Sequence, residues 1–332
     1  MRQRALGVAH AVPQQPLRIV FYARGPRGIV GQVHELVRIG GRVEEQRRQA
    51  GEVHIFRFSV LQHRQALDQV EFGANQPARV RCAFLDGLED AYEPGRAMGS
   101  FAEETCTEYQ FTREAQDEYA LRSLSRANEA IASGAFDREI VPVEVVGRKG
   151  TETITVDEQP GKANPDKIPT LKPAFAKDGT ITAANASSIS DGAAALVVTR
   201  QSVAEAQGLN IAARIVSWAT HSQEPAKFTS APVPAIRSAM EKAGWTVADV
   251  DLFEVNEAFA MVPMIAMKEL GIPAEKLNVN GGGTALGHPI GASGARIIAT
   301  LIAALQNRGL KRGVASLCIG GGEGTAIAVE IA

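Results

Sequence analysis

The sequence predicts an α/β fold, and two features of the chain support that prediction. Apolar segments of strand length alternate with helical patterns along most of the chain, as in layered α/β proteins. Several strand segments run directly into glycine or a polar residue, which is typical of a sheet that presents a site at the carboxyl ends of its strands. The sheet is therefore predicted to be mixed and largely parallel, with helices on both faces.

The composition is that of an ordinary globular protein. The chain has 332 residues, of which 45% are apolar and 22% charged, enough for one to three domains with a sizeable core. The net charge of −2 favours neither a nucleic-acid nor a membrane partner, and no apolar run is long enough to span a bilayer. Three cysteines make no disulfide framework, which predicts a cytoplasmic protein, and the histidines lack the close spacing of metal ligands.

Residues 1–82 differ in charge from the rest of the chain. They hold 13 arginines, no lysine and six acidic residues, a net charge of +7 against −9 for the remainder, so a boundary is predicted near residue 83. Only a short helix at 43–50 and a strand at 54–61 are predicted here. A transit peptide is rejected for lack of serine, and a basic nucleic-acid arm has little aromatic interleaving. The preferred hypothesis is a shifted reading frame or a wrong start.

After residue 84 the elements follow one another regularly. Thr112 is predicted to cap a helix whose first turn is acidic and which stops at Ser133. Residues 148–173 are rich in Pro, Lys and Asp and predict a long surface excursion. The other predicted strands and helices are strands 140–146, 193–199, 210–218, 251–255, 313–317 and 325–331 and helices 201–207, 234–243, 262–270 and 295–305.

One histidine lies in an unusual stretch. Residues 278–294 read Asn-Val-Asn-Gly-Gly-Gly-Thr-Ala-Leu-Gly-His-Pro-Ile-Gly-Ala-Ser-Gly, and they place His288 among glycines and small residues. Glycines let backbone approach a ligand closely, and Ser293 is predicted to cap the helix that follows. This context favours a reacting imidazole held on a turn at a helix start; the alternative is a structural turn with an incidental histidine.

Two further polar residues end apolar segments in the same way. Asn256 follows the strand at 251–255, and Cys318 follows the strand at 313–317. Because carboxyl ends of strands meet at one edge of a sheet, Asn256, His288 and Cys318 are candidate site residues.

These three stretches together carry a resemblance. Asn-Glu-Ala-Phe-Ala at 256–260, Gly-His-Pro-Ile-Gly-Ala-Ser-Gly at 287–294 and Cys-Ile-Gly-Gly-Gly at 318–322, in this order and spacing, resemble the C-terminal half of a thiolase of the acetyl-CoA C-acetyltransferase type. The resemblance runs over residues 84–332 and does not include 1–82. It implies a layered α-β-α-β-α fold whose N-terminal half is incomplete.

The resemblance divides the chain into four parts. They are an atypical Arg-rich segment at 1–83, a CoA-binding loop domain at 84–183, a remnant of the N-terminal thiolase domain at 184–208, and a C-terminal thiolase domain at 209–332. In this arrangement the strand at 193–199 is predicted to lack sheet partners.

The resemblance also implies roles. His288 is the base that activates a nucleophilic cysteine, and with a water held by Asn256 it forms an oxyanion hole. Cys318 is the second cysteine, an acid and base for the α-proton, and the Gly320 N–H is half of a second oxyanion hole. The alternative for Cys318 is an inert buried thiol.

The remaining implied residues bind coenzyme A. Ser187 is expected to hydrogen-bond the pantetheine arm, with a turn or cap residue as its alternative. An apolar lining, for which plain core residues are the alternative, is expected from Phe175, Ala183, Met98 and Phe259. Coenzyme A is a substrate or product, and neither a cofactor nor a metal is expected.

The chain departs from the family at the acylated cysteine. No motif like Cys-Gly-Ser-Gly occurs in the sequence; Cys82 lacks a glycine turn, and Cys106 is predicted on or before a surface helix. The family activity is acyl transfer on acetyl-CoA, acetoacetyl-CoA or another 3-ketoacyl-CoA. The alternative is a catalytically dead remnant that keeps a CoA-binding surface. A homodimer or homotetramer is the assembly that the resemblance implies.

Overall fold

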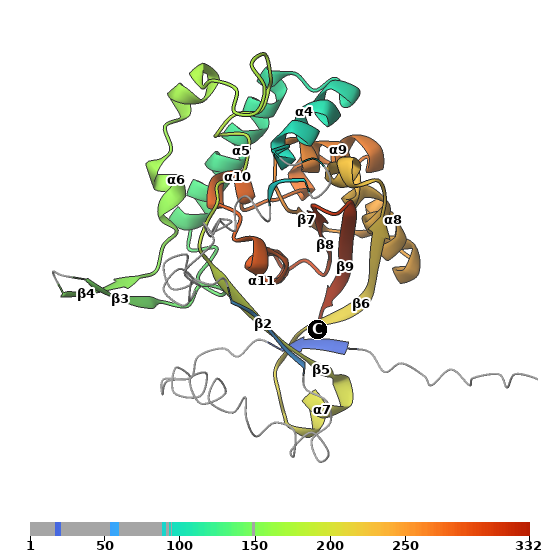
Figure 1. Cartoon of the computed structure of the whole chain (residues 1–332). Helices are drawn as coiled ribbons and strands as arrows, with labels where there is room; N and C mark the ends of the chain where they lie inside the picture. Colours follow the sequence, from blue (N-terminus) through green and yellow to red (C-terminus); the bar gives the residue numbers. More distant parts are fainter. Residues whose placement is uncertain (1–16, 21–53, 60–87, 91–92, 94, 148–149) are drawn as a thin grey trace, which may run out of the picture.

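A computed structural model gives the fold (Figure 1). It describes residues 17–20, 54–59, 88–90, 93, 95–147 and 150–332, the first two ranges as backbone only. The helix predicted at 43–50 and Cys82 lie outside the described residues.

Seven strands form the main sheet, in the order β2-β5-β1-β6-β9-β8-β7. Among the strands that the structure describes in this sheet, only β7 and β8 pair in parallel, and every other neighbouring pair is antiparallel. The prediction of a largely parallel sheet is therefore wrong, because β8 turns straight back into β9 over residues 320–322 instead of crossing over through a helix. The strands are β1 (Leu17–Val20), β2 (His54–Ser59), β5 (Ala193–Arg200), β6 (Ile211–Ser222), β7 (Leu252–Val255), β8 (Arg312–Ile319) and β9 (Glu323–Ile331).

Strand β5 has a partner on each side, which corrects the prediction that it lacks them. β1 pairs with β5 and, on its other edge, with β6, while β2 pairs with β5 along its whole length. The strand predicted at 54–61 is thus confirmed as β2. The prediction failed because two short segments rich in β-branched and aromatic residues are enough to complete the ladder.

Helices cover both faces of the sheet, as predicted (Figure 1). Neighbouring residues of β8 point to opposite sides: Val314 packs with Ile236 of α8 and Ile265 of α9, whereas Ala315 packs with Leu301 of α11. These helices are α8 (Pro232–Ala243), α9 (Met261–Leu270) and α11 (Ile290–Arg308), with the short α7 (Gln201–Ala206) after β5.

The segment before β5 makes a separate layer of helices with a projecting hairpin (Figure 1). Thr112 caps α5 as predicted, its hydroxyl accepting from the Ala115 N–H at 3.2 Å. The predicted excursion at 148–173 instead contains a strand and two short helices. The elements are α4 (Met98–Tyr109), α5 (Arg113–Ala132), β3 (Val143–Gly147), β4 (Gly150–Ile154), α6 (Glu158–Lys162) and the 3₁₀ helix η2 (Pro165–Thr170).

Candidate active site

His288 lies on the turn between α10 (Gly283–Leu286) and α11. Its backbone N–H donates to the Ser188 carbonyl at 3.1 Å. Gly287, just before it, has φ +91°, and a Cβ there would collide with the Ser190 hydroxyl. Glycine is therefore required at 287 for both conformation and space.

The imidazole is oriented by Ser293. His288 Nδ1 lies 2.5 Å from Ser293 Oγ, and that hydroxyl donates its proton to the Pro289 carbonyl at 3.1 Å. A hydroxyl has one proton, so Ser293 accepts from Nδ1–H and leaves the lone pair on Nε2. The prediction that Ser293 caps α11 is wrong: the helix begins at Ile290, and Ser293 lies inside its first turn.

Asn256 meets the other side of the ring. Its Nδ2 lies 3.3 Å from His288 Nε2, and its backbone N–H donates to the Ser316 carbonyl of β8 at 2.9 Å. The Asn256 Oδ1 is buried and has no hydrogen-bond partner among the described residues. A buried acceptor in this state is suited to receive a hydrogen bond from a water or a substrate group.

Burial keeps His288 neutral. It lowers the pKa of the imidazole to about 4, and the positive charge of Arg296 acts in the same direction. At neutral pH the ring is therefore an uncharged base with its free lone pair beside Asn256.

Cys318 ends β8 in an apolar setting. Only 7% of the residue is exposed, and it belongs to the same core cluster as Met98 and Phe259. Burial raises the pKa of the thiol to about 12, so its resting form carries the proton. Gly320 follows on the turn, where a Cβ would lie 3.3 Å from Met98 Sδ.

The four residues expected to line a pantetheine arm are only partly brought together. The rings of Phe175 and Phe259 meet edge to face with centroids 6.1 Å apart, and the Phe175 ring fills the space where Gly99 has no side chain. Met98 lies by Gly320, as above. Ala183 is exposed in a turn, outside the core cluster that holds Met98 and Phe259.

Ser187 lies beside this aromatic pair. Its hydroxyl donates to the Ala258 carbonyl at 2.9 Å, and the Ala258 carbonyl also accepts from the Ser187 backbone N–H at 3.0 Å. The lone pairs of the hydroxyl oxygen remain available as acceptors.

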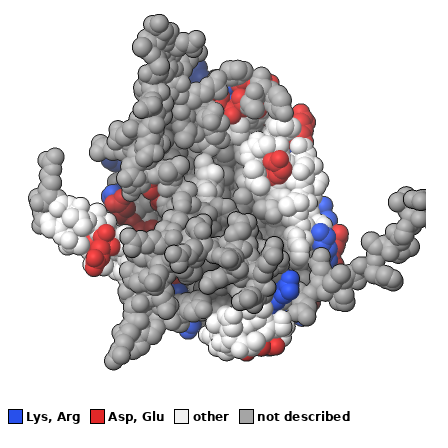
Figure 2. Space-filling model, turned by 60° about the horizontal axis from the view of Figure 1, so that its bottom comes forward, with Lys and Arg blue, Asp and Glu red and all other residues white. Residues whose placement is uncertain are grey.

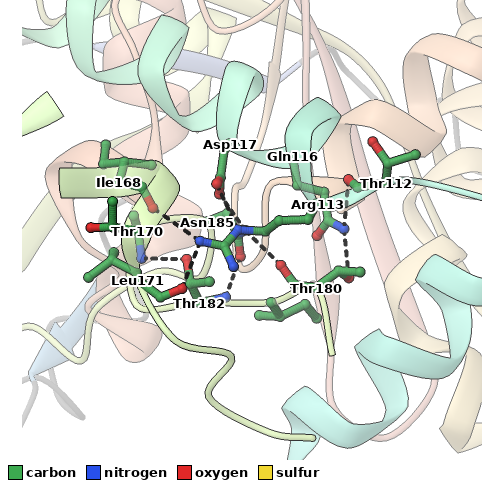
Figure 3. Close-up of polar contacts among 12 residues, drawn as sticks. Thr112, Arg113, Gln116, Asp117, Ile168, Thr170, Leu171, Thr180, Thr182 and Asn185 are labelled. Atoms are coloured by element: carbon green, nitrogen blue, oxygen red, sulfur yellow. Dashed lines mark hydrogen bonds and ion pairs between the residues drawn. The ribbon is translucent and has the colours of Figure 1, made fainter. Parts of the chain in front are cut away.

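A polar network anchors the segment that leads to Ser187 (Figure 3). Asp117 of α5 accepts from Arg113 Nε at 2.7 Å and from Asn185 Nδ2 at 2.9 Å. Arg113 also donates to the Ile168 and Leu171 carbonyls. Residues 168–185 are thereby held against α5 at both ends.

Cys106 has the surroundings of a structural thiol. It lies within α4 and is 1% exposed, which corrects its predicted place at a surface helix. Its Sγ lies 3.4 Å from Gln116 Oε1, and burial raises the pKa of the thiol to about 12. Its buried position follows from the apolar stripe of α4 that packs on the core.

Two other kinds of feature are absent from the described residues. No three His, Cys, Asp or Glu side chains gather there as metal ligands. No helix in the described ranges is both long and apolar enough to cross a membrane.

The structure gives two residues roles that the sequence analysis did not assign to them. Ser293 orients His288, and its signal in the sequence is a hydroxyl in the first helical turn after the histidine. Glu257, next to Asn256, is fully buried and surrounded by hydrogen-bond donors. Glu257 belongs to the Asn-Glu-Ala-Phe-Ala motif, but its hydrogen-bond donors Tyr119 and Ser123 are distant in the chain, so its role could not be predicted from the motif.

Three further ionisable side chains, the buried Glu254 and the half-buried Arg296 and Glu139, place buried polar atoms between α11 and the edge of the sheet. The guanidinium nitrogens of Arg296, Glu254 Oε1 and Glu139 Oε1 have no hydrogen-bond partner within the described ranges. Burial raises the pKa of Glu254 to about 8 and that of Glu139 to about 7, although Arg296 opposes both shifts. At neutral pH Glu254 is therefore expected to be mostly uncharged, while Glu139 is expected to be about half ionised.

Ser293→Ala should remove the preference of His288 for the tautomer protonated at Nδ1. With no acceptor at Nδ1, the proton is expected to distribute between the two ring nitrogens, whereas the native ring carries it on Nδ1. Nitrogen-15 NMR of labelled histidine measures this directly. Ser125→Ala on α5 is the control and should leave the spectrum unchanged; an unchanged His288 spectrum in Ser293→Ala would contradict the assignment.

Glu254→Gln should stabilise the protein at alkaline pH. The folded-state pKa of Glu254, about 8, is above its ordinary value of 4.5, so the native state holds a proton that the unfolded state loses, and stability falls as pH rises between those values. The loss is at most about 1.4 kcal/mol per pH unit. Glutamine does not ionise, so the variant should unfold at higher denaturant than the native chain at pH 9 and similarly at pH 4.

The exposed Glu241→Gln is the control for that comparison. It should not change the pH dependence of unfolding. Equal pH profiles for the native chain and Glu254→Gln would show that Glu254 is ionised in the folded protein.

Family models match most of the chain. The model described as thiolase, N-terminal domain, matches residues 59–202, and the model described as thiolase, C-terminal domain, matches residues 209–331. The N-terminal match begins at residue 59, which moves the start of the resemblance upstream from the predicted residue 84.

Individual relatives agree. The chain is 50% identical over 248 residues to cytosolic acetyl-CoA acetyltransferase of Mus musculus and 53% identical over 247 residues to acetyl-CoA acetyltransferase of Escherichia coli, each over 74% of this chain. It spans 62% of the length of each of these relatives.

A solved structure extends the comparison to the fold. The crystal structure of the Bacillus anthracis acetyl-CoA acetyltransferase superposes with a TM-score of 0.75 at 40% identity, covering 85% of this chain and 72% of that one. The predicted thiolase-like fold is thus confirmed. The chain belongs to the thiolase family.

Proposed function

We propose that this chain takes part in thiolase-type acyl transfer, forming or splitting 3-ketoacyl-CoA with acetyl-CoA or acetoacetyl-CoA as substrates. The observation that carries the proposal is the buried pair of Asn256 Nδ2 and His288 Nε2, 3.3 Å apart, at the end of β7. The acetyl-CoA acetyltransferases that the chain resembles support the choice of substrate class.

The chemistry that such a pair supports is stabilisation of an enolate. When a 3-ketoacyl-CoA is split between its α and β carbons, the acyl group passes to a nucleophile and acetyl-CoA leaves as an enolate. Donors aimed at the thioester oxygen stabilise its negative charge. We assign this role to a water held by Asn256, whose unpartnered Oδ1 is the acceptor for that water, and to His288 when its Nε2 carries the proton taken from the nucleophilic thiol. The Gly320 N–H is assigned to a second oxyanion hole.

Cys318 is assigned the proton transfer. In the splitting direction the enolate carbon takes a proton, and the protonated resting state of this thiol, with its pKa near 12, suits a donor. In the condensing direction the thiolate takes the α-proton back. His288, neutral at pH 7, is assigned as the base for a nucleophilic thiol.

Coenzyme A enters as substrate or product, with no further cofactor. We assign the pantetheine arm to the apolar lining of Phe175 and Phe259, with Met98 and Ala183 at its borders and Ser187 as its polar contact. A human mitochondrial 3-ketoacyl-CoA thiolase solved in complex with CoA is 37% identical to this chain, with a TM-score of 0.73.

The nucleophile separates this proposal from its alternative, a protein that binds CoA thioesters without turning them over. Residues 1–332 contain no Cys-Gly-Ser-Gly motif, and burial raises the pKa of both described cysteines. Enolate formation does not need the nucleophile, so the two functions are distinguishable by measuring that step alone.

The chain should exchange the methyl protons of acetyl-CoA for solvent deuterium. Cys318→Ala should slow the exchange at least about a hundredfold, since it removes the acid and base, while Cys106→Ala should retain it. Mass spectrometry of acetyl-CoA in D₂O measures both. No exchange by the native chain would favour the non-catalytic alternative, and peptide mapping after acetoacetyl-CoA treatment would locate any acylated cysteine.

We also propose that the chain self-associates, as a cytosolic protein, through the hairpin β3–β4. Every residue of its two strands is exposed, and apart from threonine and glycine these residues are apolar or acidic. Figure 2 shows white and red residues where the described part of the hairpin projects. Val146 is 82% exposed and Val143 57% exposed, a degree of apolar exposure that is typical of an interaction site. The relative from Mus musculus named cytosolic supports the location.

Val146→Asp should weaken this association. A charge in an apolar interface is costly, so sedimentation velocity should show smaller species than for the native chain. Glu144→Gln on the same strand is the control and should not shift the distribution toward smaller species. A monomeric native chain would refute the assembly.

A further inference from the structure

The Glu257 carboxylate is buried where three segments of the chain meet. It is 0% exposed and accepts five hydrogen bonds. Its Oε1 accepts from Tyr119 Oη at 2.9 Å and Asn278 Nδ2 at 2.8 Å. Its Oε2 accepts from Ser123 Oγ at 2.7 Å, Thr284 Oγ1 at 2.7 Å and the Thr284 N–H at 3.1 Å. Both oxygens are thus satisfied by donors alone.

Only a carboxylate fits this set of donors. An amide would place an NH₂ group against two or three groups that themselves donate, because glutamine has one acceptor oxygen where glutamate has two. Burial and the neighbouring Glu257 raise the pKa of Tyr119 well above its usual range, so the phenol stays protonated and donates.

The glycine run at 281–283 is fitted to this carboxylate. A Cβ on Gly282 would collide with the Glu257 carboxyl group, and one on Gly283 would lie 2.8 Å from the Glu257 carbonyl oxygen. Gly281, at φ +77°, would meet the Ser123 carbonyl at 2.6 Å. These glycines admit the protein's own backbone and a buried side chain, which corrects the prediction that they clear space for a ligand.

The network joins both halves of the Asn256–His288 pair to α5. Glu257 directly follows Asn256 in the chain, and the donors of residues 278–284 lead through α10 to His288. Ser123 of α5 bridges the two, since its hydroxyl donates to Glu257 and accepts from the Gly282 N–H at 2.9 Å.

We propose that Glu257 is a positioning residue that fixes the distance between Asn256 and His288. It acts through these two side chains and through α5, which also anchors the segment expected to line the pantetheine arm. The inference deepens the proposed function and rests on it for its kinetic consequences.

Glu257→Gln should lower kcat for deuterium exchange into acetyl-CoA by about a hundredfold, with KM changed by less than about threefold. The reason is that a misplacement of about 1 Å in a reacting geometry has an effect of this size, while the lining of the thioester arm is untouched. An equal rise of KM and fall of kcat, or an unchanged kcat, would overturn the proposal.

Glu103→Gln is the matched comparison. This carboxylate also accepts several donors, the Thr180 and Ile181 N–H groups at 2.8–3.0 Å and the Thr180 hydroxyl at 3.0 Å, but it holds the segment that carries Phe175. Its loss should raise KM and spare kcat. The same kinetic pattern in both variants would mean that Glu257 is merely structural.

Two variants guard against failure of Glu257→Gln to fold. Ser123→Ala removes one bridge and should lower kcat about tenfold, the effect of losing one hydrogen bond to a charged group. Gly282→Ala should reproduce the Glu257→Gln pattern, because it displaces the carboxylate. Gly161→Ala, in open space on α6, is its control.

Amide hydrogen exchange and the nitrogen-15 spectrum of His288 test the role of Glu257 without any catalytic turnover. In Glu257→Gln and Ser123→Ala, amide hydrogen exchange should rise at residues 256–260 and 281–288 and stay unchanged in β6 and β9. The nitrogen-15 signals of His288 should also shift. If the native chain exchanges no methyl protons, the proposed function fails and these signals still test Glu257; unchanged amide exchange and an unchanged His288 spectrum overturn the positioning role.

Discussion

The contact between Asn278 and the end of β7 determines where the site residues lie. The side-chain amide of Asn278 accepts from the Val255 N–H and donates to the Val255 carbonyl, both at 2.8 Å. The backbone N–H of Asn278 donates to the Phe253 carbonyl at 2.9 Å. A side chain thus completes the hydrogen bonding of an edge strand, as a neighbouring strand would. Its φ of +46° turns the chain at once toward Gly281.

The turn at Asn278 determines which residues meet at the candidate site. It brings residues 281–288 against the residues that follow β7, so that two catalytic candidates 32 positions apart in the chain lie 3.3 Å apart. Arg126 of α5 fastens the start of the same segment by donating to the Leu277 and Ala274 carbonyls at 2.6 and 2.9 Å. The site is therefore built on short polar contacts to backbone rather than on apolar packing alone.

Local features were predictable because their physics is local. The cap at Thr112, the stops at Gly244 and Gly271, and the strand ends at Asn256 and Cys318 each depend on a few neighbouring residues. The three motifs, read together, led to the right family, and two of their residues, Asn256 and His288, lie side by side in the structure.

Features set by distant partners were not predictable. Glu257 accepts hydrogen bonds from Tyr119 and Ser123, which precede it by 138 and 134 positions in the chain. No sequence pattern predicts which hydroxyls will contact it. The direction of β9 depends on a tight turn rather than on the alternation of helices and strands. Ser293 was misassigned because the hydroxyl of a serine near a helix start can either cap the helix or accept a hydrogen bond from a nearby histidine ring.

The place of β1 in the sheet sets an order for folding. β1 separates β5 from β6, although those two strands are joined by only a short helix, α7. β6, β9, β8 and β7 all lie after residue 210 and can pair with one another first. β1 must close a loop of more than 170 residues to reach Thr199, and such long-range pairing is slow because chain entropy opposes it. During synthesis, β1 is thus made long before β5 and β6 and is among the last of the described strands to find its neighbours.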